Sequence, residues 1–291
     1  MRAPAVAVAG SLAFLLASVA PAQAQAEPPV GVRAAGMAGA FTAVADDASS
    51  VYWNPAGLAS GAFFSLVLDH NSLDNRSATL IAIGTPPLGV SYYRTEMRES
   101  ATRPNSLVAH HAGVTVLQSL ADRVAVGATV KLVRGVVSSS GASVSTTKFD
   151  TDLGLVTTGS FGRIGLSVRN ATEPDFTAPD GQLVTLERRI RAGVALNLGR
   201  RSMAAADVDL TTAQTARGEW REAALGVETN PVKKAWLRTG VRWNTAVGQA
   251  APVGTVGLSL AVYGSTMADA QMSFGSEDGD RGWGVGLRFL F

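Results

Sequence analysis

The feature that most constrains this chain is an alternation of apolar with small or polar residues that recurs along most of its length. Every second residue is apolar in the segments 124–132, 190–198 and 283–291, and the residues between them are mostly glycine, threonine or charged. Successive side chains of a β-strand point to opposite faces, so this alternation separates one apolar face from one polar face. A helix would scatter the same residues around its axis. The pattern therefore predicts a chain built from β-strands.

About fourteen segments show this alternation, each close to the 9–11 residues of a tilted membrane strand. An even number of strands allows the sheet to close with both chain ends on the same side. The strands are expected to start near Gly61, Ala78, Leu88, His110, Val124, Lys148, Gly162, Arg188, Met203, Trp220, Ala235, Thr255, Ala268 and Gly282.

The connections between these segments alternate in length. Long ones are expected near 70–77, 97–109, 137–147, 171–187, 211–218, 245–254 and 277–281, and short ones near 86–87, 121–123, 160–161, 199–201, 230–232 and 264–265. Outer-membrane barrels have short periplasmic turns and longer outer loops. The prediction is an all-β protein, a single antiparallel transmembrane β-barrel in a bacterial outer membrane, with both termini in the periplasm.

The N-terminus carries the features of an export signal. Arg2 precedes the apolar run 5–19, and two small-residue patterns follow that place the cleavage site after Ala24 or Ala26. The run is shorter than the roughly 20 residues of a membrane-spanning helix. The chain has no cysteine, which excludes a disulfide framework and a thiolate metal site. We predict a signal peptide over 1–26, a hatch or plug segment over 27–60 and the barrel over 61–291.

Residues 31–60 break the strand pattern. The stretch from Arg33 to Val44 is rich in small residues and is expected to form a short helix, and Asp46 or Asp47 is placed to cap a second short turn. Asn54-Pro55 is expected to end that turn. Inside the mouth of the barrel, this segment would fill space and pair Arg33 with luminal carboxylates such as Asp207 or Glu222.

The face opposite the apolar one is predicted to line the lumen. It carries small residues, which leave room for an occupant, and charged residues. The luminal charged residues are predicted to be Arg189, Arg191, Asp207, Asp209, Glu222, Glu228, Arg238, Arg242 and Arg288.

The segment 31–58 resembles the N-terminal signature of the FadL-type outer-membrane β-barrel superfamily, and most closely its shorter PorV/PorQ-like branch. The matching residues are Gly31, Arg33, Gly36, Met37, Gly39, Asp46, Asp47, Ser49, Trp53, Asn54, Pro55, Ala56 and Gly57. The resemblance implies that this segment forms a hatch that plugs the barrel. It also implies that the terminal aromatic residue, Phe291, is the signal read by the barrel-assembly machinery.

The resemblance implies passive uptake of hydrophobic or amphipathic small molecules, such as fatty acids or hydrocarbons, gated by the hatch. The alternative is the PorV/PorQ-like role of a non-transporting barrel that docks or shuttles secreted or surface proteins. Fatty-acid transporters of the family carry a large apolar outer loop, whereas the connection expected at 97–109 is short and polar. The expected partners are therefore outer-membrane lipid, the assembly machinery, and either a hydrophobic ligand or a secreted protein.

The sequence offers no catalytic constellation, so a barrel enzyme is the least favoured alternative. His110 and His111 are adjacent and would point to opposite faces of a strand, so no metal site is predicted, and no cofactor is expected. The formal net charge is only +2, with both signs scattered, which gives no indication of nucleic-acid binding.

Overall fold

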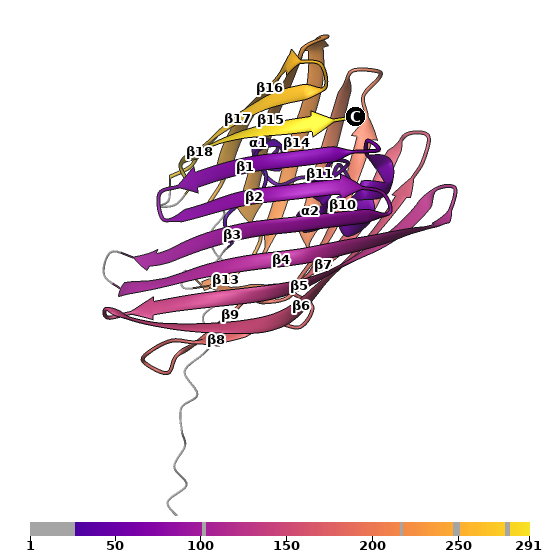
Figure 1. Ribbon diagram of the computed structural model, residues 1–291. Helices are drawn as coiled ribbons and strands as arrows, with labels where there is room; N and C mark the ends of the chain where they lie inside the picture. The colour runs from indigo at the N-terminus through magenta and orange to yellow at the C-terminus, as the bar shows by residue number, and fades with distance from the viewer. Residues whose placement is uncertain (1–26, 101–102, 216–217, 247–250, 277–279) are drawn as a thin grey trace, which may run out of the picture.

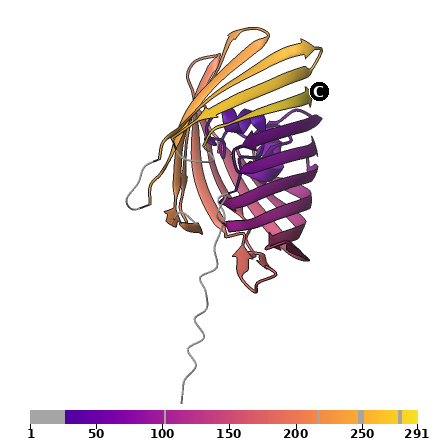
Figure 2. The same ribbon diagram turned by 90° about the vertical axis from the view of Figure 1, so that its left-hand side faces the viewer.

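The computed structural model describes residues 27–291 except 101–102, 216–217, 247–250 and 277–279, so the predicted signal peptide lies outside the described residues. Fourteen antiparallel strands close into one barrel (Figures 1 and 2). They are β1 (Ser65–Leu73), β2 (Arg76–Thr85), β3 (Leu88–Ser100), β4 (Arg103–Ala121), β5 (Val124–Ser139), β6 (Ala142–Thr158), β7 (Gly162–Arg169), β10 (Arg189–Asn197), β11 (Ser202–Asp209), β14 (Glu222–Val232), β15 (Ala235–Asn244), β16 (Val253–Tyr263), β17 (Thr266–Phe274) and β18 (Gly282–Leu290). The predicted fold class is confirmed.

The barrel closes between its first and last strands. The register of β1 and β18 runs from Ser65 opposite Leu290 to Leu73 opposite Gly282, and every other strand pairs with two neighbours in the same antiparallel manner. Closure leaves no strand edge along the wall, so the backbone groups within it are paired on both sides. The exception is the N-terminal part of β6, residues 142–152, which extends past the end of β7.

The outer face of the barrel is apolar. Large hydrophobic side chains such as Val90, Val114, Val130 and Leu132 are about half exposed, while their sequence neighbours on the luminal face are buried. An apolar belt around a closed barrel is typical of a membrane-spanning barrel. Separately, no helix among the described residues is both long and apolar enough to cross a membrane.

Strands β3 to β6 are longer than predicted, with 13, 19, 16 and 17 residues. Three expected long connections are wrong: 70–77 and 137–147 are strand apart from two-residue turns, and 97–109 is strand wherever the structure describes it. The sequence does not indicate strands there because the outward residues are polar. A strand that projects beyond the membrane needs no apolar outer face, so hydrophobic alternation fades while pairing continues. We call the projecting residues 94–100, 103–110, 133–139 and 142–149 the extension (Figure 1).

The remaining long connections lie at the same end of the barrel as the extension. The connection from β7 to β10 contains a two-stranded sheet of β8 (Asp175–Thr177) and β9 (Leu183–Thr185), and that from β11 to β14 contains β12 (Ala213–Thr215) and β13 (Gly218–Trp220). The β8–β9 sheet covers the inner face of the extension. The resulting apolar cluster consists of Met97, Leu107, Ala109, Val133, Val137, Phe176, Ala178, Val184 and Leu186.

The segment 27–61 lies inside the barrel, where Figure 2 shows its short helices enclosed by the wall. They are α1 (Val32–Gly36), α2 (Ser50–Trp53) and the 3-10 helix η1 (Pro55–Ser60). The helix expected from Arg33 to Val44 is therefore shorter than predicted. Ala38 and Gly39 both have positive φ, at 56° and 83°, and a continuing helix excludes two consecutive left-handed residues.

The two ends of the described chain lie at opposite ends of the lumen. Glu27 binds Arg169, the last residue of β7, on the side of the long connections. Phe291 exchanges backbone hydrogen bonds with Phe64 at the end where the short turns lie. The first described residue is far from Phe291 because the hatch runs along the lumen before it enters β1. The periplasmic placement of both termini stays a prediction.

Candidate functional site

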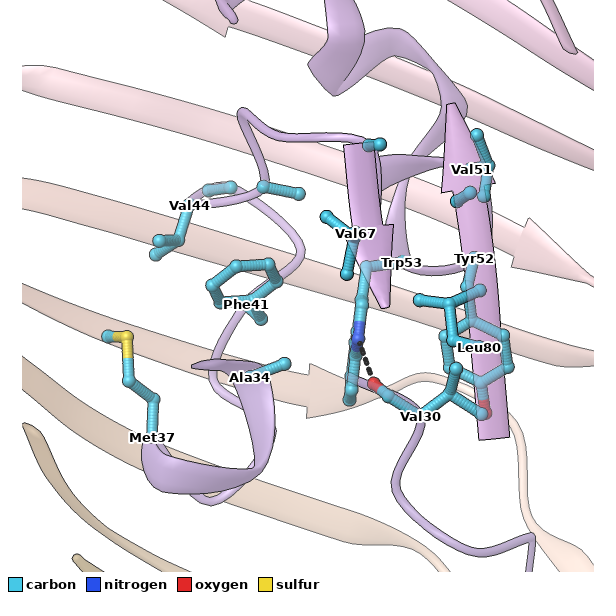
Figure 3. Close-up of a cluster of buried hydrophobic side chains, with 14 of the residues drawn as sticks. Val30, Ala34, Met37, Phe41, Val44, Val51, Tyr52, Trp53, Val67 and Leu80 are labelled. Carbon is cyan, nitrogen blue, oxygen red and sulfur yellow. Dashed lines mark hydrogen bonds between the residues drawn. The ribbon is translucent and has the colours of Figure 1, made fainter. Parts of the chain in front are cut away.

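The candidate site is the hatch, residues 27–61, and the luminal wall around it. Its interior is an apolar cluster in which Phe41 and Tyr52 meet Trp53 edge to face, at ring-centroid distances of 5.9 and 5.4 Å (Figure 3). The indole Nε1 of Trp53 donates to the carbonyl oxygen of Val30 at 2.8 Å, so the polar group of this buried ring is paired. Aromatic packing thus ties the start of the hatch to α2.

Glycines in the wall allow the hatch backbone to approach closely. A Cβ at Gly127 would lie 2.5 Å from the carbonyl carbon of Pro55, and one at Gly154 would come within 2.9 Å of the amide nitrogen of Ala56. A Cβ at Gly240 would lie 2.5 Å from the carbonyl carbon of Met37. These small luminal residues are where the wall and the hatch touch, which explains why an otherwise polar face is rich in glycine.

Arg33 of α1 is the centre of a buried ion cluster. Its Nη1 lies 2.5 Å from Asp46 and 3.1 Å from Asp47, and its Nη2 lies 2.9 Å from Glu228 on β14. The pairing of Arg33 with Asp207 or Glu222 that the sequence suggested is wrong. Both carboxylates lie elsewhere on the wall, because α1 packs against β15 to β18 rather than β10.

The cluster continues onto β15, β17 and β18. Arg238 binds Glu228 at 2.5 Å, and Arg288 binds both Asp269 at 2.5 Å and Asp47 at 3.2 Å. The Arg33 cluster is therefore defined by Arg33, Asp46, Asp47, Glu228, Arg238, Asp269 and Arg288. Three predicted luminal charges, Glu228, Arg238 and Arg288, meet the hatch in it.

The charges in this cluster stabilise each other. Burial favours the neutral form of Asp47 and raises its pKa, but the guanidinium groups of Arg33 and Arg288 outweigh burial, and the net pKa is lowered. Burial likewise lowers the pKa of Arg33, and the carboxylates of Asp46 and Glu228 reverse this and raise it well above its usual value. Removing one partner would leave a buried charge without compensation, which costs about 3–5 kcal/mol.

The second cluster consists of Arg189, Arg191, Asp209, Glu222 and Arg242, all predicted luminal charges. Arg191 binds Asp209 at 2.8 Å and Glu222 at 2.6 Å, and its Nη1 donates to the carbonyl oxygen of Gly39 at 3.2 Å. Its guanidinium also lies 6.0 Å from the ring centre of Trp53. This Arg191 cluster binds the turn that follows α1, through the carbonyl group of Gly39.

Two wall carboxylates bind the hatch through its backbone. Asp207 on β11 accepts from the amides of Phe41 and Thr42 at 3.0 and 2.9 Å. Asp69 on β1 accepts from the amide of Val32 at 2.8 Å. The sequence placed Asp207 on the luminal face, but its partners are main-chain groups, which carry no sequence signal.

The second half of the hatch, residues 48–61, contains no charged side chain, although the Arg169 guanidinium lies 4.1 Å from the ring centre of Tyr52. The Asn54 side-chain amide donates to the carbonyl oxygens of Thr42 at 2.9 Å and Leu155 at 3.0 Å, and its Oδ1 accepts from the amide of Ala56 at 3.2 Å. Asn54 is the C-cap of α2, as predicted. The expected cap by Asp46 or Asp47 is wrong, because the N-cap of α2 is Ser49, with no side-chain capping bond. Asp47 Oδ1 accepts instead from the amide of Ser49 at 2.9 Å.

A third cluster lies between the hatch and the extension, and the alternation of the sequence places its members Lys131, Asp150 and Asp152 on the polar face. Lys131 binds Asp152 at 2.7 Å and Asp150 at 3.1 Å, and Glu27 binds Arg169 at 3.1 Å. Burial raises the pKa of Glu27, but the charges of Arg169, His111 and Lys131 dominate and lower it from 4.5 to about 2.

The histidines do not form a ligand set. His111 is buried and stacks on Tyr93 at 4.1 Å, whereas the His110 ring lies on the outer face and hydrogen bonds to Tyr92. Among the described residues, no group of three or more metal-ligating side chains is positioned to hold an ion. The arrangement as a whole is a charged, filled lumen that holds a polypeptide segment in place.

The fold defines a class, a fourteen-stranded barrel with an N-terminal segment in its lumen, and solved structures share it. The CymD monoaromatic hydrocarbon channel is 13% identical, with a TM-score of 0.71 over 90% of this chain and 97% of that one. The Pseudomonas putida toluene transporter TodX is 12% identical, with a TM-score of 0.64 over 92% and 98%. A Pseudomonas aeruginosa FadL homologue is 10% identical, with a TM-score of 0.61 over 90% and 98%. At these identities the similarity concerns the fold.

No protein-family model matches the sequence, and no curated protein matches it either. The expected similarity to FadL-type barrels therefore stands on the fold, and the finer assignment to the PorV/PorQ-like branch stays a prediction.

Proposed function

We propose that this protein is an outer-membrane channel for passive uptake of hydrophobic or amphipathic small molecules, gated by the hatch. The observation that carries the proposal is that residues 31–47 bind the wall through ion clusters. Such pairs lose little free energy when both partners become hydrated together. The similar structures named above support it, because their names describe channels or transporters of monoaromatic hydrocarbons and toluene.

The sequence departs from fatty-acid transporters at 97–109, where those proteins carry a capture loop. In this protein these residues belong to the extension wherever the structure describes them. Its inner face and the β8–β9 sheet enclose an apolar cluster whose members are all buried. This cluster holds the β8–β9 sheet against the extension at the entrance of the barrel. We propose that this entrance faces the outside and that the short turns are periplasmic.

The test is a flux measurement on the full mature chain in vesicles whose outer leaflet contains lipopolysaccharide, a barrier to apolar solutes. Labelled toluene and a labelled long-chain fatty acid should both be compared with a protein-free control and with labelled glucose. We expect faster entry of an apolar probe and no effect on glucose. Equal rates with and without protein for both apolar probes would overturn the proposal.

The second candidate is a non-transporting barrel that docks or shuttles secreted or surface proteins. It is favoured by the density of ion pairs around Arg33 and Arg191, since a permanent plug has no need to be released. This candidate expects no solute flux and a defined protein partner. The same flux measurement therefore separates the two.

We also propose that Phe291 is the residue read by the barrel-assembly machinery. Its side chain is 67% exposed and follows directly after β18, so an assembly factor reaches it without unfolding the barrel. Deletion of Phe291 should reduce the amount of barrel assembled in cells while leaving refolding in detergent unchanged. A decrease in both would assign Phe291 to stability instead.

A further inference from the structure

The N-terminal part of β6 has a strand neighbour on only one side. Residues 142–152 pair with β5, but β7 begins to pair with β6 only at Leu153, opposite Val168. The chain then leaves the wall after Arg169 and turns inward into the β8–β9 sheet. The stretch 143–147 is therefore a free strand edge. It ends six residues before Leu153, where pairing with β7 begins.

The direction of the free groups follows from the hairpin that joins β5 to β6. Ser139 and Ala142 flank the two-residue turn Ser140-Gly141 and pair with each other, so even-numbered residues of β6 bond to β5. The amide of Thr158 donates to Arg123 of the preceding turn, in agreement with this parity. The backbone groups of Ser143, Ser145 and Thr147 consequently point away from β5, and none of the described residues bonds to them.

This edge lies outside the apolar belt. One row of paired residues on the outer face consists of Tyr92, Ala112, Leu132 and Phe149, and the next row consists of Arg94, His110, Arg134 and Thr147. The change from apolar to polar side chains between these rows marks the membrane boundary. Ser143 and Ser145 lie on the polar side of this boundary, beyond Thr147, where a water-soluble polypeptide can reach them.

The edge also lacks the features that usually block strand addition. Natural sheets protect edges with proline, bulges or charges. The sequence Ser143-Val-Ser-Thr-Thr147 contains none of these, and the first charge, Lys148, is paired with Asp175 at 3.1 Å. Its valine and threonines are strand formers.

We propose that the free edge of β6, residues 143–147, binds an extended segment of another polypeptide by antiparallel strand addition. The bonds would be made by main-chain groups of Ser143, Ser145 and Thr147, while the exposed hydroxyl groups beside them tolerate many partner sequences. The preferred segment is uncharged and rich in β-branched residues, like the edge itself. The proposal does not depend on solute transport.

A second copy of this chain does not fit the edge. Strands of a membrane barrel are tilted by about 35–45° from the barrel axis. Two copies inserted in one membrane are related by a rotation about its normal, so both β6 strands keep the same component along that normal. Antiparallel pairing requires opposite directions. The occupant is therefore a segment that is not fixed in the membrane.

The test uses a fluorescent peptide with the sequence of residues 132–139, which already pairs with the other side of β6. Threonine replaces Arg134 in this peptide, so that it is uncharged as the proposal requires. Fluorescence anisotropy with the full mature barrel in nanodiscs should give saturable binding. Ser145→Pro removes an outward amide and should weaken binding about tenfold or more. The matched control Ser145→Ala keeps the amide and loses only a 3.5 Å contact from Arg134, so binding should stay within about twofold.

A peptide N-methylated at every residue keeps every side chain but loses the donors on both edges, and it should fail to bind the unaltered protein. This arm needs no protein variant, and unboiled gel mobility verifies that Ser145→Pro has folded. Absence of saturable binding, or equal binding by Ser145→Pro or by the methylated peptide, would overturn the proposal. A dimer of the unaltered protein in detergent that Ser145→Pro makes monomeric would assign the edge to a second copy and overturn it as well.

Discussion

The two halves of the hatch are held in different ways. Residues 31–47 face β10 to β18 and are held by guanidinium and carboxylate groups, chiefly around Arg33 and Arg191. Residues 48–61 face β2 to β6 and are held by close backbone contact at Gly127 and Gly154 and by the amide of Asn54. Both halves are closely packed, since Gly240 contacts Met37 of the first half in the same way. The first half differs by its ion pairs, which water and ions can replace, whereas the second depends mainly on close packing.

This difference assigns separate roles to the halves. Ion pairs lose little when both partners become hydrated together, so the first half can leave its site at moderate cost. Close packing has no substitute in water, and the second half is also tethered to β1 at Ser65, whose hydroxyl accepts from the amide of Ala48. We therefore expect residues 31–47 to be the moving part of the gate and residues 48–61 to be its anchor.

The largest expected effect comes from Arg33→Met, which keeps the length of the side chain but leaves Asp46, Asp47 and Glu228 without their shared cation. The free energy of unfolding in lipid vesicles, measured with urea, should fall by about 3–5 kcal/mol. Arg98→Met is the matched control, because Arg98 is largely exposed and pairs only with Glu96, so it should cost about 1 kcal/mol or less. Equal losses would remove the distinction between buried and exposed pairs.

The next largest effect tests the anchor. Gly127→Leu would force a side chain into the carbonyl group of Pro55 and should destabilise the barrel by about 1–3 kcal/mol through overpacking. Gly254→Ala is the control, since its Cβ would meet only the carbonyl oxygen of Phe274 at 4.0 Å. Hydrogen exchange should locate the loosened amides in residues 48–61. Loosening confined to residues 31–47 would contradict the assigned anchor.

The smallest effect concerns the start of the hatch. The pKa of Glu27 is lowered from 4.5 to about 2, so its ion pair with Arg169 contributes fully above pH 4.5 and is lost as the pH falls towards 2. Release of residues 27–30 removes the acceptor of the Trp53 indole. In a variant with Trp53 as its only tryptophan, the emission maximum should shift towards the red between pH 4.5 and 2.

Glu27→Gln is the control for that titration, because the glutamine side chain carries no charge and does not titrate. Its Trp53 emission should already be shifted at pH 7 and should change little on acidification. A titration identical to that of the glutamate would show that another group controls the position of Val30.

The wall could be predicted from the sequence, whereas the contacts of the hatch could not. Alternation in segments such as 190–198 indicates strands because the lipid side and the lumen side impose different chemistry on successive residues. It fails for the extension, where residues 142–147 are surrounded by water and pair through backbone groups that leave no pattern. The identities of Arg33, Glu228 and Arg288 predicted buried charges in the lumen, but their pairing depends on where α1 ends, which positive φ at Ala38 decides.

The most direct test of the gate locks each half of the hatch to the wall in turn with an engineered disulfide. The chain has no native cysteine, so no other disulfide can form. A Cβ at Gly226 would lie 3.3 Å from that of Ala40, and one at Gly84 would lie 3.7 Å from that of Ala48, close to the Cβ separation of disulfides. We predict that oxidising Ala40→Cys with Gly226→Cys abolishes toluene flux and that reduction restores it, while oxidising Ala48→Cys with Gly84→Cys leaves flux unchanged. Undiminished flux through the barrel locked at Ala40 would contradict the account.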